Sequence, residues 1–171
     1  MFCLSGGSFY SGLTQQIRQQ TRFNIEVKPD KTKIMRYTPE VVTHLDKDEI
    51  FVFGSNLAGN HAGGAARTAY KHFGAIMGQG VGLQGQSYAI PTMQGGVETI
   101  KPYVDQFFDL AEEWDQTTFL VTRIGCGIAG FTDEEIAPLF DRALDMYNVC
   151  LPESFVKIIL ANREKKASGQ S

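Results

Sequence analysis

A glycine-rich stretch at residues 54–66 contains the residue types that could bind an anion. Its sequence is GSNLAGNHAGGAA, and it follows a short apolar run at residues 50–53. Apolar residues recur at helical spacing over residues 62–73, which predicts a helix that begins inside the stretch. The first amides of a helix lack intrahelical partners and lie at the positive end of its dipole, and glycine lets a ligand approach the backbone. The order strand, glycine loop, helix therefore predicts an anion-binding loop. A ligand-free connection between strand and helix is the alternative.

A second glycine loop follows a second strand pattern. Residues 118–124 are rich in β-branched and apolar types, which predicts a buried strand, and the sequence GCGIAGF follows at residues 125–131. Thr132 and Glu135 then have the spacing of a capping box at the start of a helix predicted over residues 133–147. In open α/β sheets, ligands bind beyond the carboxyl ends of the strands. We therefore expect both glycine loops to line one crevice.

Several polar side chains in or beside these loops could contribute chemistry. The imidazole of His61 could act as a general acid or base. Asn56 and Asn60 could bind ribose hydroxyls or hold an attacking water. Arg123 could pair with a phosphate through two hydrogen bonds, and Asp133 is the remaining candidate acid. Each has a structural alternative: an exposed histidine in a flexible loop, asparagines that stabilise turns, an arginine that neutralises an acidic neighbour, and a carboxylate that caps a helix.

Composition excludes several classes of function. The chain of 171 residues is long enough for one domain with its own core, and a net charge of −3 argues against an extended nucleic-acid surface. The cysteines, Cys3, Cys126 and Cys150, show neither disulfide nor metal spacing, and Cys126 is more often a packing residue than a nucleophile in such a setting. The histidines form no zinc pattern. No apolar run has the length of a membrane span, and the N-terminus lacks a signal-peptide pattern. We expect a cytoplasmic protein with no metal, no cofactor and no membrane partner.

Strand and helix patterns alternate along the chain, which favours right-handed crossovers and a mostly parallel sheet. We predict an α/β fold, a three-layer α/β/α sandwich with a mixed, mostly parallel sheet. Residues 1–34 would be an N-terminal extension or the product of an upstream start site, residues 35–162 the domain, and residues 163–171 a frayed polar tail. The predicted strands cover residues 50–53, 87–91, 118–124 and 155–161, and the predicted helices cover residues 63–73, 100–115 and 133–147.

Three segments together resemble a known group of proteins. They are FGSNLAGNHAGGAA at residues 53–66, GLQGQSYAIPT at residues 82–92 and TRIGCGIAG at residues 122–130. They resemble a group of uncharacterised bacterial and phage proteins that is similar to macrodomains, the α/β/α modules that bind ADP-ribose. The RIGCG sequence is particularly similar to the phosphate-binding loop of the macrodomains that remove terminal ADP-ribose from proteins. The resemblance covers about residues 35–160.

The resemblance implies roles for particular residues. The amides of residues 125–129 would hold a diphosphate, Asn56 would lie near the distal ribose, and Gly63 and Gly64 would form the facing loop. In the terminal ADP-ribose hydrolases an aspartate follows the sequence Gly-Cys-Gly-Leu and works with a lysine on the earlier helix. Here Ala129 follows Gly-Cys-Gly-Ile at the matching position, although Lys71 lies on the corresponding helix. The catalytic candidates are Asn56 and His61. The predicted ligand-binding residues are Gly54, Ser55, Asn56, Asn60, Gly63, Gly64, Arg123, Gly125, Cys126, Gly127, Ile128, Ala129 and Gly130.

Two main classes of function remain open from the sequence. The first is an enzyme that hydrolyses an ADP-ribose linkage or a related nucleotide derivative, which the polar residues of the first loop support. The second is a non-catalytic module that senses or sequesters ADP-ribose, NAD fragments or a nucleotide signal, which the missing aspartate favours. A structural protein that uses the fold for protein contacts is a third class. The expected partner is an ADP-ribose-like nucleotide, free or attached to a macromolecule, in a bacterial or phage-infected cytoplasm.

Overall fold

A computed structural model describes residues 36–169, which belong to a compact unit that spans residues 34–171. The predicted N-terminal extension at residues 1–34 lies outside the described residues. The strands are β1 (Glu49–Ser55), β2 (Gly82–Gln84), β3 (Ser87–Pro91), β4 (Thr118–Val121) and β5 (Val149–Cys150). The helices are α2 (Gly64–His72), α3 (Val97–Glu113), α4 (Asp133–Ile136), the 3₁₀ helix η1 (Ala137–Asp145) and α5 (Glu153–Ala167).

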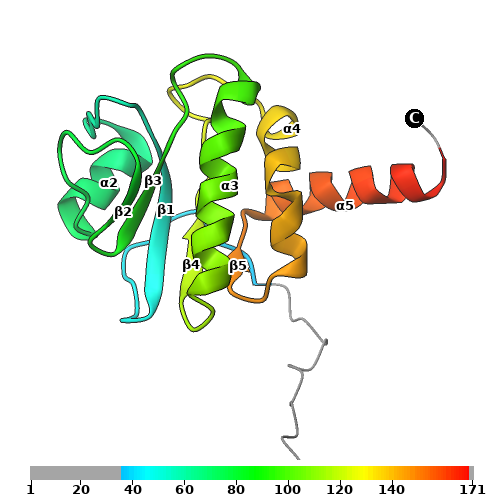
Figure 1. Cartoon of the computed structure of the whole chain (residues 1–171), viewed down its shortest axis with the longest axis horizontal. Coiled ribbons are helices and arrows are strands. Elements are labelled where there is room, and N and C mark those ends of the chain that lie inside the picture. The colour runs from blue at the N-terminus through cyan, green and yellow to red at the C-terminus, as the bar shows by residue number, and fades with distance from the viewer. Residues whose placement is uncertain (1–35, 170–171) are drawn as a thin grey trace, which may run out of the picture. The chain divides into compact units, whose positions relative to one another are not determined.

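The five strands form one sheet in the order β2-β3-β1-β4-β5 (Figure 1). β1 is parallel to both β3 and β4, and β4 is parallel to β5. Only the edge strand β2 is antiparallel to its neighbour. The prediction of an α/β fold with a mixed, mostly parallel sheet is therefore confirmed. Because β1, β3 and β4 run in the same direction, the loops that leave their carboxyl ends all begin at one edge of the sheet.

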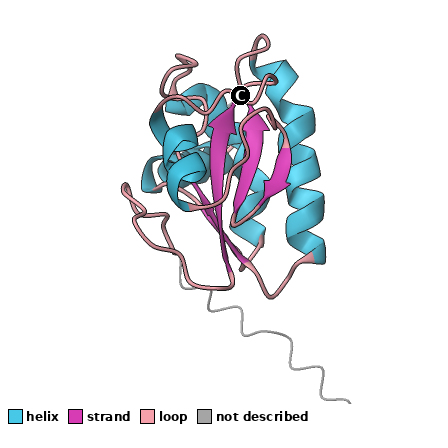
Figure 2. Cartoon of the chain, turned by 90° about the vertical axis from the view of Figure 1, so that its left-hand side faces the viewer, coloured by secondary structure: helices cyan, strands magenta, loops and turns pink. Residues whose placement is uncertain are grey.

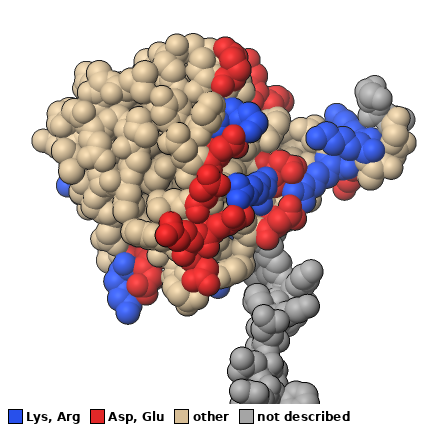
Figure 3. All heavy atoms as spheres, in the orientation of Figure 1, with Lys and Arg blue, Asp and Glu red and all other residues tan. Residues whose placement is uncertain are grey.

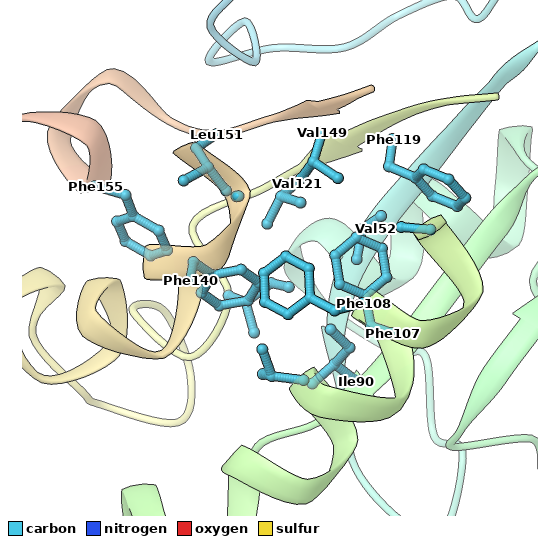
Figure 4. Close-up of a cluster of buried hydrophobic side chains, with 14 of the residues drawn as sticks. Val52, Ile90, Phe107, Phe108, Phe119, Val121, Phe140, Val149, Leu151 and Phe155 are labelled. Carbon is cyan, nitrogen blue, oxygen red and sulfur yellow. The ribbon is translucent and has the colours of Figure 1, made fainter. Parts of the chain in front are cut away.

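Alternating side chains of β1 divide the core into two layers. Ile50 and Val52 belong to a large cluster with side chains of α3, η1 and α5, in which Phe107 and Phe119 meet edge to face at 5.4 Å between ring centroids (Figure 4). Phe51 and Phe53 belong to a smaller cluster that α2 covers. Successive side chains of a strand point to opposite faces of the sheet, so a strand with both faces buried contributes to both clusters. Helices consequently lie on both sides of the sheet, as Figure 2 also shows.

The prediction of a strand at residues 155–161 is wrong, because these residues lie within α5. Phe155, Val156 and Ile159 are buried whereas Lys157 and Leu160 are exposed, a spacing that places one face of a helix against the core. The last strand is instead the two-residue β5, just before this run. A short apolar run fits a strand and a buried helix equally well until its neighbours are known.

The other corrections also concern the C-terminal part. The capping box of Thr132 and Glu135 is present, but the helix predicted over residues 133–147 is one α-helical turn followed by the 3₁₀ helix η1. The tail predicted from Arg163 is helical as far as Ala167. The Arg163 guanidinium holds this part of α5 against η1, because it donates hydrogen bonds to the Asp141 and Asp145 carboxylates at 2.8–3.2 Å.

None of the helices within residues 36–169 combines the length and the apolar character that a bilayer span requires.

Charge is distributed unevenly over the described chain. Residues 50–97 contain no Asp or Glu, and their only Lys and Arg residues are Arg67 and Lys71. On the face drawn in Figure 3, charged side chains accordingly gather over the α3, η1 and α5 part of the molecule.

Candidate functional site

A cavity of about 380 Å³ lies where β1, β3 and β4 end. Residues from the 54–66 segment, where β1 leads into α2, form one part of its lining, and residues from the 122–129 segment, which follows β4, form another. The two glycine loops therefore line one cavity, as the order of strands and helices predicted. Of the predicted ligand-binding residues, only Cys126 and Gly130 are not among those that line the cavity.

Some lining residues were missed from the sequence. Thr92 and Met93 line the cavity directly after β3, because β3 is the parallel neighbour of β1. Thr122 and Ile124 belong to the segment that leaves β4, and Ala62, Ala65 and Ala66 complete the lining around the start of α2. The order of strands in the sheet would have indicated Thr92, since every parallel strand beside β1 ends at this edge. That order is not encoded in any local pattern.

Unpaired backbone amides lie on both sides of the cavity. Among the described residues, no hydrogen bond is made by the amides of Gly125, Gly127, Ile128 and Ala129. On the facing side, α2 begins without a side-chain cap, since the residue before it is Gly63, and its first amides are unpaired as well. A Cβ on Gly54 would lie 3.3 Å from the Gly125 nitrogen, so glycine at this position lets the β1 end approach the second loop closely. Amides without a hydrogen-bond partner among the described residues therefore occur in both segments that line the cavity.

Of the described residues that line the cavity, only Arg123 has an ionisable side chain. Its guanidinium is already paired, because Nη2 and Nε donate to Asp133 Oδ1 at 2.7 and 3.1 Å. Burial of Asp133 opposes ionisation, but hydrogen bonds from neighbouring side chains, Arg123 foremost, hold the pKa of the carboxyl below its usual range. The Asp133 carboxylate therefore neutralises much of the Arg123 charge, and Asp133 itself does not line the cavity.

Cys126 is a poor nucleophile in this environment. Burial, together with the nearby Asp133 carboxylate, raises the pKa of its thiol to about 12. The thiol is half-buried, and its Sγ lies 3.5 Å from the Ile124 carbonyl oxygen. Because only the thiolate attacks, Cys126 acts as a packing residue behind the loop.

His61 does not line the cavity, and the expectation of an exposed ring in a flexible loop is wrong. The residue is 1% exposed, and its ring packs edge-on against Phe53 at 5.2 Å between centroids. Nε2 lies 3.0 Å from the Ile76 carbonyl oxygen and 3.1 Å from that of Gln79. Both partners are acceptors, so Nε2 carries the proton and donates. The imidazole joins the first loop to residues 76–79, a contact that no local pattern could predict.

Asn56 lines the cavity but is engaged in its own loop. Its Oδ1 accepts a hydrogen bond from the Asn60 amide, and its Nδ2 donates to the Asn60 carbonyl oxygen, each at 3.0 Å. Lys71 is exposed on α2 and does not line the cavity, whereas Ala129 does. The lining residues therefore include no carboxylate, imidazole or amine. Among the described residues, no group of three or more histidine, cysteine or acidic side chains is placed to hold a metal ion.

The fold and the cavity define an α/β protein with a glycine-lined cavity at the carboxyl ends of a mostly parallel sheet. No protein-family model matches the chain, and no curated protein matches it.

We predict that His61→Ala destabilises the fold. The substitution removes a donor shared by the Ile76 and Gln79 carbonyl groups and leaves space beside Phe53, so the free energy of unfolding should fall by about 1–3 kcal/mol. Urea denaturation measures this, with the exposed His72→Ala as the matched control, which should change stability by less than about 0.5 kcal/mol. A variant as stable as the parent would contradict the assignment of His61 to loop structure.

We also predict that Cys126 reacts slowly with alkylating reagents. With its pKa at about 12, the labelling rate should still rise about tenfold per pH unit near pH 10, where an ordinary thiol has levelled off. Peptide mass spectrometry after iodoacetamide treatment follows Cys126 separately from the other cysteines. Asp133→Asn should speed labelling at a given pH, because it removes a charge that raises the thiol pKa, whereas the remote Asp105→Asn should not. Rapid labelling of the parent at pH 7 would contradict this environment.

Proposed function

We propose that the protein binds ADP-ribose or a closely related nucleotide in the cavity between the two glycine loops. The observation that supports this most directly is the set of unpaired amides at Gly127, Ile128 and Ala129, opposite the uncapped start of α2. Amides directed at an anion, together with the positive end of a helix dipole, are a general means of binding phosphate. A diphosphate has enough oxygen acceptors to use donors from both sides at once.

The size and the lining of the cavity suit the rest of such a ligand. Small-molecule sites usually have volumes of roughly 300–1,000 Å³ and mainly apolar walls with a few polar groups. The cavity of about 380 Å³ lies within this range, and Ala62, Ala66, Met93 and Ile128 give it apolar surface. Met93 and Ile128 are 53% and 74% exposed, so they provide aliphatic surface that a ribose or a base could cover.

Binding without hydrolysis is the function that this lining favours. General acid–base catalysis needs a titratable side chain within hydrogen-bond reach of the reacting atoms. The lining offers only Arg123, which is paired with Asp133, and Ala129 stands where the similar hydrolases have an aspartate. Of the two catalytic candidates, His61 is turned away into the fold and both polar side-chain atoms of Asn56 are engaged. We therefore favour a module that senses or sequesters the nucleotide.

Two further observations support this proposal. The three segments that resemble macrodomains contribute to the ends of β1, β3 and β4, which surround the cavity. A cytoplasmic location fits both an intracellular nucleotide and the free thiol of Cys126.

We predict that Gly127→Val abolishes nucleotide binding while the fold is retained. A Cβ at Gly127 meets no atom within 4 Å, so the loop can accept a side chain. Valine would occupy the space in front of the unpaired amides, and the loss of two charge-assisted hydrogen bonds, each about 1.5–3 kcal/mol, corresponds to at least about a hundredfold in affinity. Isothermal titration calorimetry with ADP-ribose, ADP, AMP, NAD and a cyclic dinucleotide measures this.

The matched control is Ala58→Val, which adds the same side chain to an exposed position of the first loop outside the cavity. It should bind as the parent does, and thermal denaturation should show both variants folded. Unchanged affinity in Gly127→Val would show that the second loop does not hold the ligand. Failure of the parent to bind any of these nucleotides at millimolar concentration would refute the proposed function.

A further inference from the structure

One polar side chain of the cavity differs from the others in having no partner. The other polar side chains in the lining are all engaged within the fold. Asn60 is the exception, since its side-chain amide makes no hydrogen bond to any described residue, although it lines the cavity. The engaged groups are Ser55 Oγ with the Gly80 carbonyl, Asn56 with the Asn60 backbone, Thr92 Oγ1 with the Ser55 carbonyl, Thr122 Oγ1 with the Val52 carbonyl, and Arg123 with Asp133.

The backbone of Asn60 is held in place by Asn56. The carboxamide of Asn56 bonds both the amide and the carbonyl of Asn60, each at 3.0 Å, and the Gly59 amide donates to the Asn56 carbonyl oxygen at 2.9 Å. These three bonds close residues 56–60 into a compact loop. The position from which the Asn60 side chain extends is therefore fixed before any ligand arrives.

This compact loop is in turn fixed to the segment that precedes β2. The Gly78 amide donates to the Gly59 carbonyl oxygen at 2.9 Å, and a Cβ on Gly59 would overlap the backbone of Gln79. The buried imidazole of His61 bonds the same segment directly after the loop. A side chain displayed from so constrained a loop loses little backbone entropy on binding, which favours both affinity and specificity.

We propose that Asn60 is the specificity-determining residue of the cavity and that Asn56 is a positioning residue that acts through it. This inference rests on the proposed function. A carboxamide offers N–H donors and a carbonyl acceptor together, so it pairs best with a neutral group that both accepts and donates. In a nucleotide, this chemistry is found in the adjacent hydroxyls of a ribose and in the amino and ring-nitrogen edge of adenine. The anion would be held separately, by the backbone amides.

Calorimetry on Asn60→Ala, Asn56→Ala and Leu57→Ala tests the division of roles. Asn60→Ala should weaken ADP-ribose binding about three- to tenfold, the effect of one or two neutral hydrogen bonds, with an unchanged melting temperature. Asn56→Ala should lower the melting temperature, because it frees the Asn60 amide and carbonyl, and should weaken binding through the loosened loop. Leu57→Ala, a truncation of an exposed side chain in the same loop outside the cavity, should change neither.

Two further ligands identify the group that Asn60 contacts. If it is the distal ribose, Asn60→Ala should weaken binding of ADP-ribose but not of ADP. If it is the adenine edge, the same variant should weaken ADP-ribose and ADP equally and should lose the preference of the parent for ADP-ribose over its hypoxanthine analogue. Either pattern supports a specificity role for Asn60.

If the parent binds ADP-ribose and the Asn60→Ala variant binds each of these ligands as tightly as the parent does, this inference alone would be overturned. A melting temperature that falls in Asn60→Ala but not in Asn56→Ala would also overturn it, because the roles would then be reversed. A parent that binds none of the nucleotides would refute the proposed function and the inference together, so the two failures are distinguishable.

Discussion

The parallel pairing of β1 with β3 on one side and with β4 on the other is the constraint on which the cavity depends. It brings the ends of three strands to one edge of the sheet, so that segments distant in sequence surround one space. The close approach of Gly54 to Gly125 is possible because Gly54 has no side chain. The alternating side chains of β1 stabilise this arrangement, since they anchor the strand in both layers of the core.

The polar groups around the cavity are divided between structure and recognition. Hydroxyls, the Asn56 carboxamide and the His61 ring satisfy backbone groups of the surrounding loops, which leaves the walls rigid. Among the described residues, the donors that remain are backbone amides, the side chain of Asn60 and those N–H groups of Arg123 that do not bond Asp133. Because the Arg123 charge is largely neutralised by Asp133, attraction for an anion would come mainly from oriented dipoles. Such a lining suits recognition of a ligand better than chemistry on it.

Much of this arrangement could be predicted from the sequence, because its signals are local. The glycine stretches after apolar runs indicated both loops, and the Thr132 capping box located the start of α4. The features that were missed depend on tertiary contacts. The burial of His61 requires residues 76–79 to pack against the first loop, and Thr92 enters the lining only because β3 pairs with β1. The last strand of the sheet is β5, in the segment just before Phe155, and the apolar run that begins at Phe155 belongs to α5.

If the protein binds an anionic nucleotide as proposed, amides of both glycine loops contact the same ligand. A titration of ¹⁵N-labelled protein with ADP-ribose, followed by amide chemical shifts, tests it most directly. We expect the amides of Gly125, Gly127, Ile128 and Ala129 to shift together with those of Gly64 and Ala65, along one binding curve, while amides of α5 remain unchanged. Large shifts confined to residues outside the cavity, or shifts in only one of the two loops, would contradict it.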